Sequence, residues 1–179
     1  MIKPIKNITR IRKEHAQTMV EFALVFPIIL LITYGIIEFG RMVFIYAAVT
    51  GSAREGARYG AASGAINGTR FYKDCTGIVG AVQRGSLLTT IDPANIDIWY
   101  DNGPNPTQTW ATCPPVGSNG LDPIMLGDRI VVHVEACYEP IIDFVGVVGG
   151  DCSDPTDPDR IIFEAENGRT ILLNVESKK

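Results

Sequence analysis

The N-terminal third of the chain is dominated by one unbroken run of apolar residues. Between Phe22 and Ile37 there is no charged side chain. At about 1.5 Å of rise per residue, this run spans about 24 Å as a helix. Adding residues 18–20 brings the helix close to the thickness of the hydrocarbon core of a bilayer, about 30 Å. Because unsatisfied backbone polar groups are costly in lipid, the run predicts a membrane-spanning helix over about residues 18–38.

The pattern beyond the apolar run predicts that the same helix continues, now with small side chains. Residues 42–63 contain no proline and are rich in Gly, Ala and Ser, so we expect one helix over residues 17–64. Each glycine costs about 1 kcal/mol of helix propensity relative to alanine, which indicates a packing reason. Either the helix lies against a sheet of its own head, or it packs against helices of other subunits, and both can hold on different faces. Pro27 is expected to kink or loosen the helix near Phe22.

The remaining residues, 65–179, have the pattern of a small antiparallel head. A short amphipathic helix is predicted over residues 78–91, and alternation of apolar and polar side chains predicts a strand over 96–100. The strongest strand signal is Asp128–Tyr138, in which the apolar residues at even positions are expected to face the core. Residues 101–127 are rich in Gly, Pro, Asn and Thr and are expected to form a long loop.

The chain is expected to end in a hairpin. Two strands, Arg160–Ala165 and Thr170–Val175, flank Asn167-Gly168, a dipeptide that favours a tight turn. The predicted fold class is therefore α+β, with a long N-terminal membrane-spanning helix followed by a small antiparallel-sheet head.

Charge distinguishes the two sides of the apolar run. Residues 1–16 carry an excess of Lys and Arg, whereas acids outnumber bases after the run. This asymmetry predicts a cytoplasmic leader over residues 1–16, a helix over 17–64 and an exported head over 65–179, with the protein held in the cytoplasmic membrane. The net charge of −4 gives no basic patch for nucleic acid.

The cysteines all lie in the expected exported part, at Cys75, Cys113, Cys137 and Cys152. An even count in such a region predicts two disulfides. We favour Cys75–Cys113 with Cys137–Cys152, but four cysteines allow three pairings and the sequence does not choose among them. A zinc site is disfavoured because no pair has the short CxxC-type spacing.

Metal binding is also considered for an acidic loop, in which Asp151, Asp154, Asp157 and Asp159 lie close together. Calcium takes several oxygen ligands of this kind. The spacing does not match an EF-hand, and two prolines stiffen the segment, so a solvated acidic loop is favoured and calcium is the alternative. His133 lies on the polar face of its predicted strand and is interpreted as a surface residue without a catalytic or metal-binding role.

The sequence contains no pattern of a known catalytic site. GxSxG, HExxH, the phosphate loop and the dinucleotide fingerprint are all absent. The two histidines, His15 and His133, lie on opposite sides of the expected membrane. We therefore predict that the protein is not an enzyme and needs no cofactor.

The start of the apolar run contains the residues on which a functional prediction depends. Ala16 is the last residue of the basic leader. Glu21 lies at the start of the apolar helix, and no partner for its carboxylate is expected within the same helix. A lone carboxylate at a membrane edge costs free energy unless it finds a cation. If the leader is cut between Ala16 and Gln17, Glu21 could neutralise the new amine of a neighbouring subunit and set the axial register of the helices. The alternative is an ordinary interfacial glutamate that the helix dipole favours.

At the other end of the apolar run, Glu38 and Arg41 are spaced i, i+3. A local ion pair that anchors the helix at the outer membrane edge is the favoured interpretation. A contact between subunits is the alternative.

The segment HAQTMVEFALVFPIILLITYGIIEFGRMVFIYAAVTGSAREGARYGA resembles the TadE-like family, the pilin-like proteins of the tight-adherence (Flp-type) pilus system. Shared features are a basic leader, a small residue before Gln17, the VEFAL-x-x-P run, an acid followed by Gly and Arg, and repeated Ala-Arg pairs. The later GDRIVVHV and YEPIIDFVG resemble the family's outer strand and following apolar segment more weakly. The chain departs from the family at Ala16, where Gly is usual, but prepilin peptidases of this type accept small residues.

The resemblance implies a type IV pilin-like subunit that a membrane prepilin peptidase cuts between Ala16 and Gln17. It further implies assembly with other pilins and with pilus-assembly platform proteins into an oligomer or filament, which would be extracellular afterwards. The head beyond residue 64 indicates a minor pilin or pseudopilin, because the major pilins of this system are very small. The alternative is an uncleaved, single-pass membrane-anchored envelope protein whose external head binds a ligand.

Overall fold

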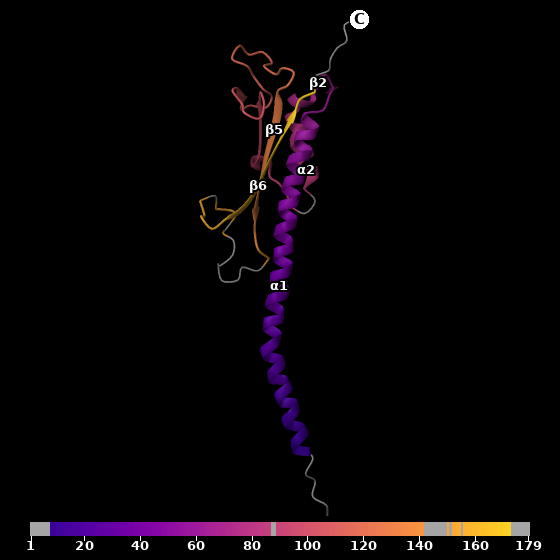
Figure 1. Cartoon of the computed structure of the whole chain (residues 1–179), viewed down its shortest axis with the longest axis vertical. Helices are drawn as coiled ribbons and strands as arrows, with labels where there is room; N and C mark the ends of the chain where they lie inside the picture. The colour runs from indigo at the N-terminus through magenta and orange to yellow at the C-terminus, as the bar shows by residue number, and fades with distance from the viewer. Residues whose placement is uncertain (1–7, 87–88, 142–149, 151, 155, 173–179) are drawn as a thin grey trace, which may run out of the picture. The chain divides into compact units, whose positions relative to one another are not determined.

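The computed structural model describes residues 8–86, 89–141, 150, 152–154 and 156–172. It has the predicted α+β fold, a long N-terminal helix followed by antiparallel strands (Figure 1). The helices are α1 (Ile8–Gly60) and α2 (Cys75–Gly85), with short 3-10 turns at Phe71–Lys73 and Pro93–Asn95. The strands are β1 (Ala65–Ile66), β2 (Thr69–Arg70), β3 (Ile96–Asp101), β4 (Thr109–Trp110), β5 (Arg129–Tyr138) and β6 (Ile161–Thr170). The chain divides into two compact units, residues 1–41 and 42–179.

The first unit contains the apolar part of α1. The helix continues through Pro27 without a break. The hydroxyl of Thr33 donates to the carbonyl of Ile29 at 2.8 Å, which satisfies a polar group that lipid could not. The large apolar side chains of this part are exposed. Among the described residues, α1 is the one helix long and apolar enough to cross a membrane, so it fits a membrane anchor.

The second unit is a head built on a four-stranded antiparallel sheet with the strand order β4-β3-β5-β6. β5 and β6 lie side by side along their whole lengths, from Arg129 opposite Thr170 to Tyr138 opposite Ile161 (Figure 1). The predicted alternation in β5 is confirmed, because Ile130, Val132 and Val134 are completely buried. β4 pairs with β3 inside the segment that was expected to be loop only.

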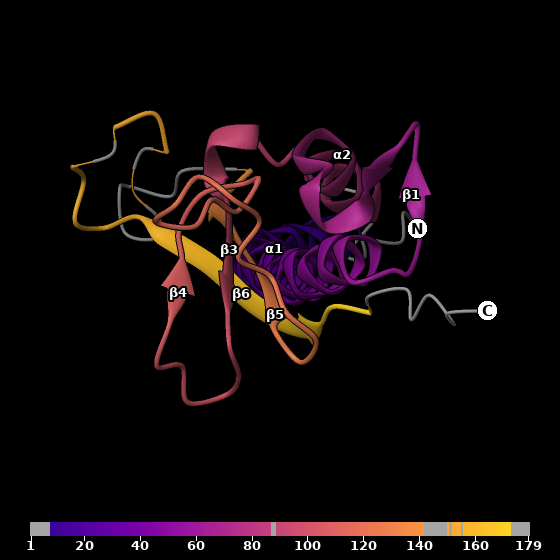
Figure 2. The ribbon, with the colours of Figure 1, turned by 90° about the horizontal axis from the view of Figure 1, so that it is seen from above.

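The second half of α1 packs against the buried face of the sheet and against α2. Figure 2 shows this part of the helix with the sheet on one side and α2 on another. A Cβ on Gly56 would lie 2.5 Å from Cγ2 of Val82 and 3.2 Å from Cγ1 of Val132. A Cβ on Gly60 would collide with Ile130 in the same way. The glycines therefore allow helix and sheet to approach each other closely, as expected if the helix lies against the sheet of its own head. The residues of α1 in this core are Ile45, Val49, Ala53 and Ala57.

The predicted C-terminal hairpin is wrong. Asn167 and Gly168 lie in the middle of the continuous strand β6, opposite Val132 and Val131 of β5. A turn at this position would leave the first half of β5 paired with β3 alone, whereas the continuous strand β6 pairs with β5 along its whole length. The tight turn is made instead by the earlier Asn67-Gly68, which joins β1 to β2 with φ angles of 50° and 81°.

The predicted amphipathic helix also has different bounds, Cys75–Gly85 instead of residues 78–91. It begins earlier because the side chain of Asp74 caps it, accepting a hydrogen bond from the N–H of Gly77. It ends at Gly85, whose added Cβ would lie 2.9 Å from the Cα of Ser52, so α2 lies against α1 at this end too.

Replacing Gly56 tests the close approach of α1 to the sheet. Gly56→Ala is expected to lower the free energy of unfolding of the head by about 1–2 kcal/mol, because overpacking exceeds the gain in helix propensity. Gly51→Ala is the matched control, since a Cβ there meets nothing within 4 Å. It should be neutral or stabilising. Denaturation of the full chain in detergent, followed by the fluorescence of Trp99 and Trp110, measures both changes, and equal effects would contradict the packing argument.

Candidate functional site

The residues predicted to take part in processing lie on α1. The peptide bond between Ala16 and Gln17 is within the helix. The side-chain amide of Gln17 donates to Oε1 of Glu21 at 3.3 Å. The prediction that Glu21 has no partner in its own helix is therefore wrong, because the i, i+4 spacing places the two side chains one above the other. The partner is neutral, so it orients the carboxylate without removing its charge.

The predicted ion pair at the other end of the apolar run is present. Nη1 of Arg41 lies 3.1 Å from Oε1 of Glu38, and Glu38 is only 7% exposed. A carboxylate that is removed from water needs such a cation nearby. The role of this pair at a membrane edge or between subunits stays a prediction.

The structure contains two disulfides, Cys75–Cys113 and Cys137–Cys152, which is the pairing that we favoured. The first joins the start of α2 to the segment that follows β4. The second joins the end of β5 to the acidic loop. Each closes a segment of the head that would otherwise have few constraints, so both lower the entropy of the unfolded chain.

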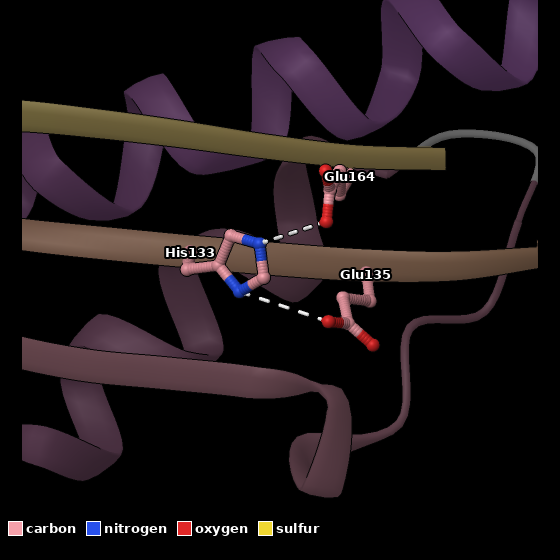
Figure 3. Close-up of side chains that lie close together, drawn as sticks. All are labelled: His133, Glu135 and Glu164. Carbon is pink, nitrogen blue, oxygen red and sulfur yellow. Dashed lines mark ion pairs between the residues drawn. The ribbon is translucent and has the colours of Figure 1, made fainter. Parts of the chain in front are cut away.

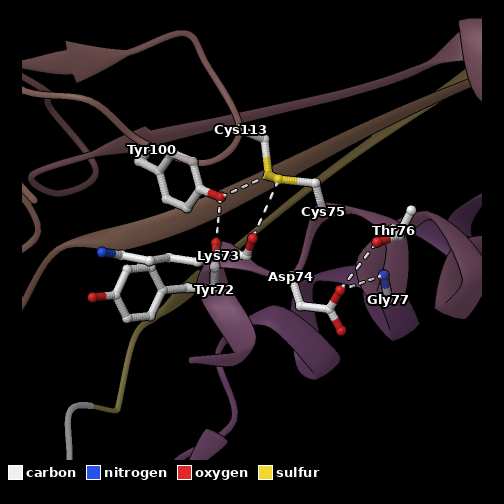
Figure 4. Close-up of a disulfide and its surroundings, with 8 residues drawn as sticks. All are labelled: Tyr72, Lys73, Asp74, Cys75, Thr76, Gly77, Tyr100 and Cys113. Atoms are coloured by element: carbon white, nitrogen blue, oxygen red, sulfur yellow. Dashed lines mark hydrogen bonds between the residues drawn. A yellow bond between two sulfur atoms is a disulfide. The ribbon is translucent and has the colours of Figure 1, made fainter. Parts of the chain in front are cut away.

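Asp74 connects the two helices beside the first disulfide. Figure 4 shows its contacts with Thr76 and Gly77 at the start of α2. Its carboxylate accepts hydrogen bonds from the N–H of Gly77 at 3.0 Å and the hydroxyl of Thr76 at 3.2 Å. The hydroxyl of Tyr59, on α1, also donates to it at 2.7 Å. The hydrogen bonds from Tyr59 and then from Gly77 lower the pKa of Asp74. The start of α2 is thereby fixed to α1 by a charged cap.

Two buried tyrosines hold the surrounding segments (Figure 4). The hydroxyl of Tyr100 donates to the carbonyl of Tyr72 at 2.5 Å and lies 3.1 Å from Sγ of Cys113. The hydroxyl of Tyr72 donates to Asp122, which also pairs with Nζ of Lys73 at 2.7 Å. Burial, followed by the hydrogen bond to Asp122, raises the pKa of Tyr72 to about 12. These contacts fix the segment between β4 and β5 to the first 3-10 turn.

A buried ion pair joins β3 to β5. Both oxygens of Asp101, which is 3% exposed, accept hydrogen bonds of 2.7 Å from the guanidinium of Arg129. Burial alone would raise the pKa of Asp101, but the hydrogen bonds from Arg129 and from the N–H of Gly103 lower it below the usual value. The sequence analysis missed this pair because the two residues are far apart in the chain and only the strand register brings them together.

The outward face of the sheet brings His133 together with carboxylates from three strands, of which Figure 3 shows Glu135 and Glu164. Nδ1 of His133 lies 3.9 Å from Asp97 of β3 and 4.0 Å from Glu135 of β5. Nε2 lies 3.7 Å from Glu164 of β6. The sequence predicted that His133 lies on the polar face of its strand, but it gave no sign of these neighbours.

In the acidic loop, two of the described carboxylates accept hydrogen bonds from the loop itself. Asp154 accepts from the N–H and the hydroxyl of Thr156, and Asp157 accepts from the N–H of Asp159. Asp151 lies outside the described residues. These turns are the expected geometry of a solvated loop, and calcium binding there stays a prediction.

A long apolar N-terminal helix whose second half packs in the core of an antiparallel-sheet head is consistent with a pilin-like α+β fold. The family model described as TadE-like protein matches residues 16–58 of this chain. The resemblance predicted from the sequence is therefore confirmed for this segment, which starts at Ala16 and ends in the second half of α1. No curated protein and no solved structure matches the chain.

Asp74→Asn tests the charged cap. The lowered pKa of Asp74 means that its ionised form stabilises the fold at pH values above the unfolded pKa. This stabilisation is lost as the pH falls through the folded pKa. The variant should therefore melt at a lower temperature than the original chain near neutral pH, and the difference should shrink as the pH is lowered towards 3 (about one unit below the ordinary pKa of an aspartate). Melting curves of both chains measure this, and a difference that does not change with pH would contradict the role of the charge.

Proposed function

We propose that this protein is a non-enzymatic pilin-like subunit of a tight-adherence (Flp-type) type IV pilus, as a minor pilin or pseudopilin. The observation that carries the proposal is the family match over residues 16–58, which includes Gln17 and Glu21 on a helix that fits a membrane anchor. The proposal places the basic leader in the cytoplasm and the head outside, in agreement with the charge asymmetry of the two flanks.

In the proposed processing step, a prepilin peptidase hydrolyses the peptide bond between Ala16 and Gln17. The leader leaves with a new carboxylate, and Gln17 keeps the new amine at the end of an apolar helix. This amine is positively charged near neutral pH, since ordinary α-amino groups have pKa values of about 8. Cleavage therefore converts an anchored precursor into a helix with a cationic end.

In the proposed assembly step, the amine of one subunit pairs with Glu21 of its neighbour. An uncompensated acid at the centre of a membrane helix costs about 2.5–3.5 kcal/mol, and the cost is smaller near the edge. Glu21 is exposed, and its partner within the helix is the neutral side-chain amide of Gln17, so a cation on a neighbouring subunit can reach its carboxylate. Relief of this cost favours one axial register between helices, because a shift of one turn separates the two charges.

The partners that follow are the prepilin peptidase, other pilins and the platform proteins that assemble the pilus. The protein is held in the cytoplasmic membrane before assembly and becomes part of an oligomer or extracellular filament afterwards. The head of residues 65–179 favours a minor or initiating role over that of the main filament subunit. The second disulfide and the buried ion pair Asp101–Arg129 support a head that stays folded outside the cell.

Processing is tested by expressing the full chain with and without an active prepilin peptidase of this class. The expected mature protein begins at Gln17, as measured by N-terminal sequencing and intact mass. Ala16→Gly should still be cut, whereas Ala16→Leu should block cleavage because the bulky side chain replaces a small one. If the N-terminus stays intact while the same peptidase cuts another pilin, the uncleaved membrane-anchored envelope protein is the better description.

The register role is tested with Glu21→Ala. This variant should be cleaved and inserted into the membrane as usual, but it should assemble poorly with partner pilins, as measured by co-purification and by sheared pili. Glu55→Ala is the control, because Glu55 lies on the same helix and its ion pair with Arg58 is exposed and contributes little to stability. Normal assembly of the Glu21→Ala variant would show that Glu21 is only an interfacial residue.

A further inference from the structure

The cluster around His133 is a product of strand register. His133 and Glu135 are two residues apart on β5, so their side chains project from the same face of the sheet. Glu164 of β6 lies directly opposite Glu135, and Asp97 of β3 lies directly opposite His133. Three neighbouring strands thus bring one imidazole and three carboxylates to one place on the outward face. Figure 3 shows the imidazole with the carboxylates of Glu135 and Glu164.

This arrangement places like charges together. Glu135 and Glu164 are directly opposite each other on adjacent strands, a position in which two negative charges destabilise a sheet. Among the described residues, Arg129 is the one arginine or lysine on this face of β5. Its guanidinium already donates hydrogen bonds to both carboxylate oxygens of Asp101. The ion pairs of Glu135 and Glu164 are made with His133. A bound cation would remove the repulsion that the strand register creates.

We propose that His133, Glu135 and Glu164 form a binding site for a divalent transition-metal ion such as Zn²⁺. Within the described part of the chain, these three residues are the one group of potential ligands whose atoms all lie within 4.8 Å of one another. Ligands of a tetrahedral Zn²⁺ ion at about 2.1 Å are about 3.4 Å apart, so small rotations of the two long, partly exposed glutamates bring them into place. The proposal does not depend on the pilin function.

The ligand chemistry selects the class of metal. An imidazole nitrogen with carboxylate oxygens suits zinc and other first-row transition ions, whereas calcium and magnesium prefer oxygen ligands only. In this site Nε2 of His133, which faces Glu164, would coordinate the ion. Asp97 lies 3.9 Å from Nδ1, and a small rotation of its exposed side chain would let it accept a hydrogen bond from Nδ1–H and hold the ring in the required tautomer. Asp97 is therefore a positioning residue.

A metal ion at this site would link two strands of the sheet and would keep one coordination position free. Glu164 belongs to β6, which ends the strand order, so the ion would fasten this edge strand to the central strand β5. Three protein ligands leave the fourth position of a tetrahedral ion for water or for a ligand from another molecule.

The test uses the full chain in detergent, without a polyhistidine tag and with His15→Gln, so that His133 is the one remaining histidine. Calorimetric titration with Zn²⁺ is expected to give one equivalent bound, and Zn²⁺ should raise the melting temperature. Co²⁺ should give the visible absorption of a tetrahedral site. Ca²⁺ and Mg²⁺ at the same concentrations should produce neither binding heat nor a melting shift.

Variants of the cluster decide the outcome. His133→Gln and Glu164→Gln should each weaken Zn²⁺ binding at least about tenfold and abolish the melting shift. Glu166→Gln is the matched control, because Glu166 lies opposite His133 on β6 but is not among the three proposed ligands. It should leave binding essentially unchanged. Absence of stoichiometric Zn²⁺ binding, or binding that both variants leave intact, would overturn the proposal and leave His133 as a simple partner of its carboxylates.

Discussion

The head depends on the close approach of α1 to the sheet at Gly56 and Gly60. Without side chains at these positions, the helix backbone reaches Val132 and Ile130 directly, and α2 packs Val82 and Ile78 against the same turns. Each glycine weakens the helix by about 1 kcal/mol relative to alanine, while each buried methylene of the surrounding aliphatic side chains contributes about 0.8 kcal/mol. Burial outweighs propensity here, which explains why a sequence so rich in glycine remains helical.

Polar contacts then fix the elements that surround this core. The charged cap at Asp74 connects α1 to α2, and the ion pair Asp101–Arg129 joins β3 to β5. The disulfides hold the longer connections. The head is thus stabilised by its own contacts, and the exposed apolar surface of the first unit is left for lipid or for other helices. This division of roles within one helix agrees with the family match, which covers both parts.

The sequence predicted those features that depend on local periodicity. The apolar run of α1, the alternation in β3 and β5 and the number of disulfides required only spacing and composition, whereas the pairing of the cysteines did not follow from them. The sequence did not predict features that depend on which residues of neighbouring strands lie opposite each other. Asn67-Gly68 and Asn167-Gly168 are the same dipeptide, but only the first forms a turn, because the second lies opposite β5 and gains a full ladder of hydrogen bonds. The acids around His133 and the partner of Asp101 could not be predicted either, since both depend on which strands are neighbours.

The core joins residues from opposite ends of the head. Ile45 lies in the helix that is synthesised first, whereas Ile171, which is completely buried, follows the last described strand. The sheet is also incomplete until β6 pairs with β5. During biosynthesis, the head therefore cannot reach its native state until the residues up to Ile171 have emerged from the ribosome.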